Sequence, residues 1–123
     1  MTTATNSVGT GRALFRATLI GTVLQLAMVV SGHYDRSIAQ GFAVGGLLLS
    51  LLAGFLFGRA AGISSKGAAA VGGLIAGGVC ALIGIVESFY LGDVPAAVIA
   101  FGTAGSAVTG AIGGVLGKLT RRG

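Results

Sequence analysis

Apolar residues dominate four long stretches of this chain, and short polar segments separate them. The stretches cover approximately residues 13–32, 37–58, 67–90 and 95–117. Each holds about 20 residues or more, which at about 1.5 Å per residue lets a helix cross a hydrocarbon core of roughly 30 Å. None shows the alternation of polar and apolar positions that barrel strands require. The pattern therefore predicts four transmembrane helices.

The polar connections between these stretches are short and read HYDR, RAAGISSK and LGDV. Short connections make neighbouring helices antiparallel. We therefore expect two tandem helical hairpins that pack as an all-α integral membrane four-helix bundle. The bundle occupies residues 12–118, between a flexible cytoplasmic N-terminal tail at 1–11 and a basic cytoplasmic tail at 119–123.

The composition favours a membrane protein over a soluble one. Hydrophobic residues make up 54% of the 123 positions and charged residues only 9%, whereas a soluble domain has roughly 25% charged residues on average. The net charge of +5 does not indicate nucleic-acid binding, because the basic residues lie singly or in pairs at the ends of apolar stretches. We expect no nucleic-acid partner and no cofactor.

Charge is distributed unevenly between the two sides of the predicted bundle. One side carries the basic residues Arg12, Arg16, Arg59, Lys66, Lys118, Arg121 and Arg122. The other side carries Arg36 and all three acids of the chain. Basic residues are retained on the cytoplasmic side, so both termini are predicted to be cytoplasmic, in a prokaryotic inner (plasma) membrane. The alternative for the first stretch is a cleaved signal peptide, which leaves three spans.

The second and fourth stretches match each other when the chain is shifted by 59 positions. The shift aligns Phe42 with Phe101, Gly46 with Gly105, Ser50 with Thr109, Gly54 with Gly113, Gly58 with Gly117 and Arg59 with Lys118. A shift of 56 positions aligns Gly21 with Gly77 and Tyr34 with Tyr90. These matches indicate a parallel internal repeat of two like-oriented hairpins. Chance matching in a glycine-rich chain is the alternative.

Small residues recur at about every fourth position in three of the stretches. They are Gly46, Ser50, Gly54 and Gly58; then Gly73, Gly77 and Gly84, with Cys80 or Ala81 between the last two; and Gly105, Thr109, Gly113 and Gly117. This spacing forms a stripe along one helix face and allows the close backbone approach by which helices associate in lipid. The stripes pack either inside the bundle or against another subunit.

A few polar residues are candidates for a site. His33, Asp35, Arg36, Glu87 and Asp93 form a predicted cluster at the outer face, where Arg36 is the natural partner of Glu87. One histidine with scattered carboxylates does not supply the three or four converging ligands of a metal site. Gln25 lies near the middle of the first stretch, where we expect it to bond across helices; a hydrated path is the alternative.

No catalytic motif stands out in the sequence. No histidine or acid lies at a depth where it could activate a serine. The stretch GVLGKLT differs from a phosphate-binding loop, because Ile112 takes the place of its first glycine and Leu119 that of its Ser or Thr. The single cysteine, Cys80, is expected to be a small buried hydrophobe.

The segment Ala53–Gly84 resembles small glycine-rich four-helix membrane proteins of prokaryotes. The matching residues are Ala53, Gly54, Gly58, Arg59, Ala61 and Gly62, followed by Lys66 and Gly67. The resemblance covers about a quarter of the chain. It implies the four-helix fold and no particular activity.

The glycine stripes and the lack of charge near the middle of the spans favour a non-enzymatic function. We expect helix–helix association, as a homo-oligomer or as an accessory or structural subunit of a larger membrane complex, with the bilayer and other subunits as partners. A small oligomeric channel or transporter is the alternative, although such proteins usually place an ionisable group at the midplane. A membrane enzyme would have only the outer polar cluster to use.

Overall fold

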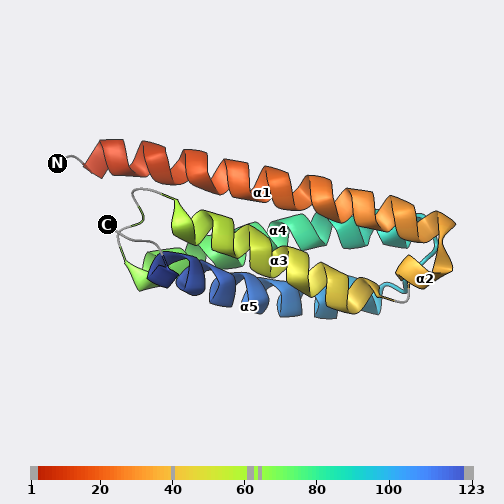
Figure 1. Cartoon of the computed structure of the whole chain (residues 1–123). Coiled ribbons are helices and arrows are strands. Elements are labelled where there is room, and N and C mark those ends of the chain that lie inside the picture. Colours follow the sequence, from red (N-terminus) through yellow and green to blue (C-terminus); the bar gives the residue numbers. More distant parts are fainter. Residues whose placement is uncertain (1–2, 40, 61–62, 64, 121–123) are drawn as a thin grey trace.

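The computed structural model describes residues 3–39, 41–60, 63 and 65–120 of the chain. Its helices are α1 (Thr3–Tyr34), α2 (Arg36–Ala39), α3 (Phe42–Arg59), α4 (Lys66–Tyr90) and α5 (Ala97–Thr120). The four long helices run up and down the bundle in turn, so that the two ends of the chain lie at the same end of the molecule (Figure 1). The all-α part of the predicted fold is therefore confirmed.

Three of these helices are long and apolar enough to cross a membrane, judged on the residues that the structure describes. The three segments are Gly11–Tyr34, Lys66–Tyr90 and Ala97–Thr120. The apolar helix over Val44–Arg59 is shorter. These four segments coincide with the four apolar stretches of the sequence.

The helix ends differ from the predicted ones in three places. Helix α1 begins at Thr3 and so includes residues that we expected in a flexible tail, because extending an existing helix costs far less than starting one. The second stretch is divided into α2 and α3, with a turn at Gly41 between them. Helix α5 begins after Pro95, whose carbonyl accepts a hydrogen bond from Val98 N. Residues 121–123 lie outside the described part.

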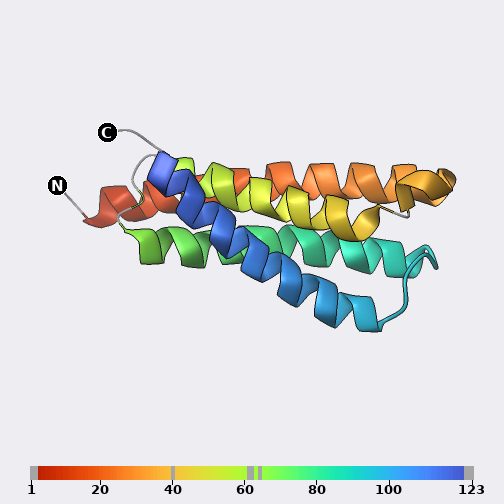
Figure 2. The same cartoon turned by 60° about the horizontal axis from the view of Figure 1, so that its bottom comes forward.

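The helices pack unevenly. Helices α1 and α5 lie on opposite sides of α3 and α4 (Figure 1), and the most extensive contacts are those of α5 with α4 and with α3. Helix α5 crosses α3 in its C-terminal part and diverges from it toward its N-terminal end (Figure 2). We call the half of the bundle that ends at Arg59, Lys66 and Lys118 the basic half, and the other half the acidic half.

Small residues fill most of the core. Its buried members include Ala17, Ala53, Ala69, Ala76 and Cys80. The largest fully buried side chain is that of Phe57, whose ring lies directly on Gly72, where a methyl group would overlap it. A core of this kind keeps the backbones close together, so the bundle depends on contacts between backbones more than on interdigitated large side chains.

Local signals in the sequence fix both ends of α4. The Ser65 side chain accepts a hydrogen bond from Ala68 N at 3.1 Å and caps the first turn. At the other end Gly92 adopts a left-handed conformation with φ of 82°. Its N–H bonds to Phe89 O, and the N–H of Asp93 bonds to Ser88 O, which is the Schellman arrangement. This turn directs the chain back from α4 toward α5.

Candidate functional site

In the basic half, the glycine stripes of α3 and α5 face each other. A methyl group added at Gly54 would overlap the carbonyl oxygen of Gly110, and one added at Gly58 would overlap that of Gly114. From the opposite side, a methyl group at Gly113 would overlap the carbonyl of Leu51. Only glycine permits this distance between the two backbones, so the stripes are used inside the chain here.

These contacts are reciprocal. Gly54 meets the carbonyl of Gly110, and Gly113 meets that of Leu51. Adding 59 to the α3 residue of each pair gives the α5 residue of the other pair, because 54 becomes 113 and 51 becomes 110. The contact of Gly58 with Gly114 has the same counterpart in that of Gly117 with the Phe55 carbonyl. The α3–α5 crossing is thus locally symmetric under the shift found in the sequence.

Helix α4 packs into the same region through its own stripe. A methyl group at Gly73 would overlap the carbonyl of Gly110, and one at Gly77 would lie 2.8 Å from Gly110 Cα and 3.2 Å from Ser50 O. Farther along, a methyl group at Gly84 would lie 3.0 Å from Gln25 Cβ. The predicted stripe of α4 therefore faces α5 at one end and α1 at the other.

Gln25 lies at the junction of three helices and is 2% exposed. Its Nε2 donates to Gly46 O at 3.2 Å and Ser50 Oγ at 3.4 Å on α3, and to Cys80 Sγ at 3.9 Å on α4. The Ser50 hydroxyl in turn donates to Gly77 O at 3.3 Å. The side chain thus bonds across helices, and Cys80 is buried beside it.

A groove of about 530 Å³ opens beyond this junction, in the acidic half. It is lined by residues of all four long helices, in the half of the bundle where the ribbons of α3 and α5 diverge (Figure 2). Most of its lining is apolar, and its polar groups come from Gln25, Ser88, Asp93 and Ser106. The buried hydroxyl of Ser88 has no hydrogen-bond partner among the described residues. We call this the lateral groove.

The two stripes continue into the lateral groove but touch little there. A methyl group at Gly46 would lie 3.8 Å from Gln25 Oε1, and one at Gly105 would lie 3.8 Å from Leu47 Cδ2, which are ordinary contacts. Thr109 bonds to its own helix through Gly105 O at 2.8 Å. Each stripe is therefore closed in the basic half and open in the acidic half.

The polar cluster expected at the outer face forms only in part. His33 Nδ1 lies 2.9 Å from Asp93 Oδ2, which joins the end of α1 to the turn after α4. Asp35 instead accepts hydrogen bonds from the backbone and hydroxyl of Ser37, at 3.0 and 2.7 Å. No group of three or more His, Cys, Asp or Glu able to hold a metal occurs among the described residues.

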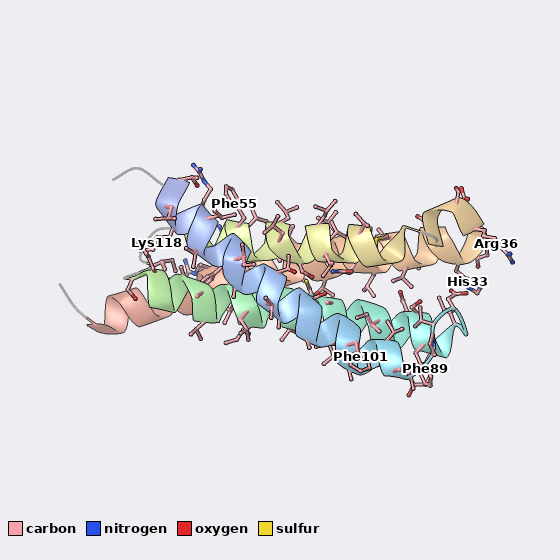
Figure 3. The ribbon with its side chains drawn as sticks, turned by 90° about the horizontal axis from the view of Figure 1, so that it is seen from below. His33, Arg36, Phe55, Phe89, Phe101 and Lys118 are labelled. Atoms are coloured by element: carbon pink, nitrogen blue, oxygen red, sulfur yellow. The ribbon has the colours of Figure 1, made fainter. Side chains whose placement is uncertain are left out.

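The expected pairing of Arg36 with Glu87 does not form. Arg36 lies on α2, after the end of α1 at Tyr34, and points away from the bundle (Figure 3). Glu87 Oε1 is buried and has no hydrogen-bond partner among the residues that the structure describes. The same holds for the hydroxyl of Thr103 on α5. The acidic half thus contains buried polar atoms that the described chain does not satisfy.

Three contact residues of α5 were not selected from the sequence. Ser106, Gly110 and Gly114 form a second stripe beside the predicted one, and all three are buried. Their spacing of four positions was visible in the sequence. It could have indicated that α5 contacts two helices at once, because adjacent stripes on a helix face different neighbours.

The fold and the groove define a class: an all-α bundle of apolar helices, three of them long enough to span a membrane, with a groove lined by residues of all four long helices. Beyond this class, the chain matches no protein-family model, no curated protein and no solved structure.

Proposed function

We propose that the chain is an integral membrane protein with four spans, in a prokaryotic inner membrane with both termini cytoplasmic. Large apolar side chains cover its outer surface, including Leu19, Val23, Leu48, Leu74, Phe101 and Leu116, as lipid contact requires. Helix α3 has 18 residues and would be about 27 Å long, close to the hydrocarbon thickness. The basic half, which contains both chain ends, would face the cytoplasm.

Within the membrane we propose that the protein acts through helix–helix association, as a homo-oligomer or as an accessory subunit. The observation that carries this proposal is the open end of the glycine stripes. Methyl groups at Gly46 and Gly105 would make only ordinary contacts with the described residues, so both positions leave room for the close approach of another helix. Lipid supplies little force between helices, so small-residue faces and hydrogen bonds drive association there.

The lateral groove is the proposed contact surface, and a helix of a second membrane protein is the proposed occupant. The open walls continue the two stripes that close on each other in the basic half, so the surface has the chemistry that already joins helices in this chain. The groove also has polar groups in its lining, from Gln25 and Ser106. Hydrogen bonds from such groups add to the close packing that drives helix association in lipid.

The test compares Gly105→Leu with Ala104→Leu. Position 105 lines the groove, whereas Ala104 is exposed on the adjacent face of α5. Gly105→Leu should remove the associated species in native mass spectrometry and in cross-linking within membranes, and Ala104→Leu should retain it. The melting temperature of each purified variant shows whether the bundle is intact. A strictly monomeric, partnerless native protein contradicts the proposal.

A second candidate function is the binding of a small amphipathic molecule, as in a transporter or channel. The volume of the lateral groove favours it, because ligand pockets typically measure about 300–1,000 Å³ and combine apolar walls with a few polar groups. The same purification distinguishes the two. A bound small molecule in the mass spectrum, lost in Gly105→Leu while the protein is monomeric throughout, would favour this second function.

We also infer that the two hairpins derive from a duplication. The reciprocal contacts of α3 and α5 support it, because the 59-residue shift relates them in space as well as in sequence. The arrangement of α1 differs from that of its counterpart α4, which contacts both α3 and α5 extensively. A duplication followed by displacement of the first helix accounts for both observations.

A further inference from the structure

A second groove lies between α1 and α3, in the basic half. It measures about 390 Å³, and its lining residues are Arg12, Ala13, Arg16, Ala17, Ile20, Leu56 and Ala60. Arg12 and Arg16 are one helical turn apart on the same face of α1, and both are exposed. Ile20 follows one turn farther into the bundle. The groove is thus cationic at its end and apolar along its length.

The two arginines differ from the other cations around them. Arg59 donates to Thr120 Oγ1 at 3.4 Å and lies over the ring of Phe55. Lys118 donates to Ile63 O at 2.9 Å. For Arg12 and Arg16 the described part of the chain provides no hydrogen-bond acceptor and no ion-pair partner. No described residue therefore occupies their ten N–H donors.

No acidic side chain of this chain lies near the two arginines. The sequence contains only three acids, and Asp35, Glu87 and Asp93 all lie in the acidic half, at the opposite end of the helices. Guanidinium groups bind phosphate with paired hydrogen bonds. Cationic pockets between transmembrane helices on the cytoplasmic side bind anionic headgroups.

We propose that this groove binds an anionic phospholipid, with the phosphate held between Arg12 and Arg16. The proposal rests on the membrane placement given above. A lipid is favoured over a soluble phosphate because the groove continues from the arginines onto Ile20 and Leu56, a path suited to an acyl chain. The charged and apolar parts thus follow each other in the order that a phospholipid presents.

The experiment measures bound lipid by native mass spectrometry on protein purified with a mixture of phosphatidylglycerol and phosphatidylcholine. Wild type should retain phosphatidylglycerol selectively. Each of Arg12→Gln and Arg16→Gln should reduce the selectivity about fivefold, and the double variant about 25-fold, since each basic side chain near an anionic surface contributes about that factor. Replacement of both by lysine should retain most of the selectivity, because it preserves the charge.

Lys66→Gln is the matched control, because Lys66 is an exposed cation at the same end that does not line the groove. It should leave the selectivity within about twofold, because a charge outside the groove does not contact the bound headgroup and its longer-range attraction is screened by salt. An equal loss in Lys66→Gln would overturn the proposal, since general surface charge would then be responsible. Competition by inorganic phosphate as effective as that by phosphatidylglycerol would overturn the assignment to a lipid.

The membrane placement is tested separately, by washing membranes at alkaline pH. Release of the protein would contradict the proposed function itself. Retention of the protein together with equal binding of the two lipids would contradict only the lipid site. Unchanged melting temperatures of the arginine variants in phosphatidylcholine alone would show that the bundle is intact. If the double variant does not fold, the arginines act in folding and the lipid proposal is contradicted.

Discussion

At the scale of single residues, the glycines of α5 fall into two groups that differ in their surroundings. Gly113 meets the backbone of α3 so closely that a methyl group would overlap the Leu51 carbonyl, whereas a methyl group at Gly105 would reach only Leu47 Cδ2 at 3.8 Å. The two positions lie on the same stripe of the same helix, two turns apart. The difference arises entirely from the crossing of α3 and α5.

This difference predicts effects of opposite sign. Gly113→Ala should lower the free energy of unfolding by about 3 kcal/mol, because backbone atoms cannot move aside for the methyl group. Gly105→Ala should raise it by up to about 1 kcal/mol, because alanine favours the helix where space is available. Denaturant titration of the purified protein in detergent measures both. Equal destabilisation by the two changes would show that the helices pack along the whole stripe.

The sequence was informative about which residues pack and less so about what they pack against. The spacing of Gly54 and Gly113 predicted a smooth helix face, and Gln25 was expected to bond across helices. Periodicity along one helix does not contain the crossing angle of two helices, which determines where a stripe closes and where it opens. The lateral groove therefore became visible only in the structure, as did the contacts of the second stripe through Gly110, although the spacing of that stripe is present in the sequence.

At the scale of elements, the turn after α4 determines the geometry of the acidic end. Gly92 is the only residue with a positive φ among those that the structure describes. Its turn places Asp93 where Oδ2 reaches His33 Nδ1. The end of α1 and the turn after α4 are thereby joined by one ion pair or hydrogen bond, and Asp93 also lines the lateral groove.

Gly92→Ala should lower the free energy of unfolding by about 1 kcal/mol, because a side chain in the left-handed region clashes with its own carbonyl. Gly67→Ala is the control, since a methyl group there would meet only Ser65 Oγ at 3.8 Å within the first turn of α4. It should leave stability unchanged or raise it slightly. The same denaturant titration measures both variants. An unchanged free energy of unfolding in Gly92→Ala would mean that the turn accommodates the methyl group without losing stability.

Elements were easier to predict by their apolar interiors than by their ends. Hydropathy located all four long helices, because each has an apolar segment that coincides with a helix. It could not locate the start of α1 at Thr3 or the break between α2 and α3 at Gly41. Those ends depend on helix extension and on local turns, and the apolar pattern contains no information about either.

At the scale of the whole molecule, the two ends of the bundle differ in charge and in packing. The basic half is closed by backbone contacts between glycines and contains the groove with the two arginines. The acidic half is open between α3 and α5 and contains all three acids. The two proposed binding surfaces therefore lie in opposite halves of the bundle and, in the proposed orientation, in opposite leaflets of the bilayer.

The proposed orientation in the membrane can be tested by labelling single cysteines introduced into a Cys80→Ser variant. Cys80 is fully buried, so the background change should leave labelling unaffected. Tyr90→Cys lies at an 81% exposed position of the acidic end. It should react with a membrane-impermeant maleimide in spheroplasts whose inner membrane is intact. Ser65→Cys, at the basic end, should react only after the membrane is permeabilised. This result is expected because the loops with more Lys and Arg are the ones retained in the cytoplasm. Labelling in the reverse order would show that the topology is inverted and that the arginine groove lies in the outer leaflet.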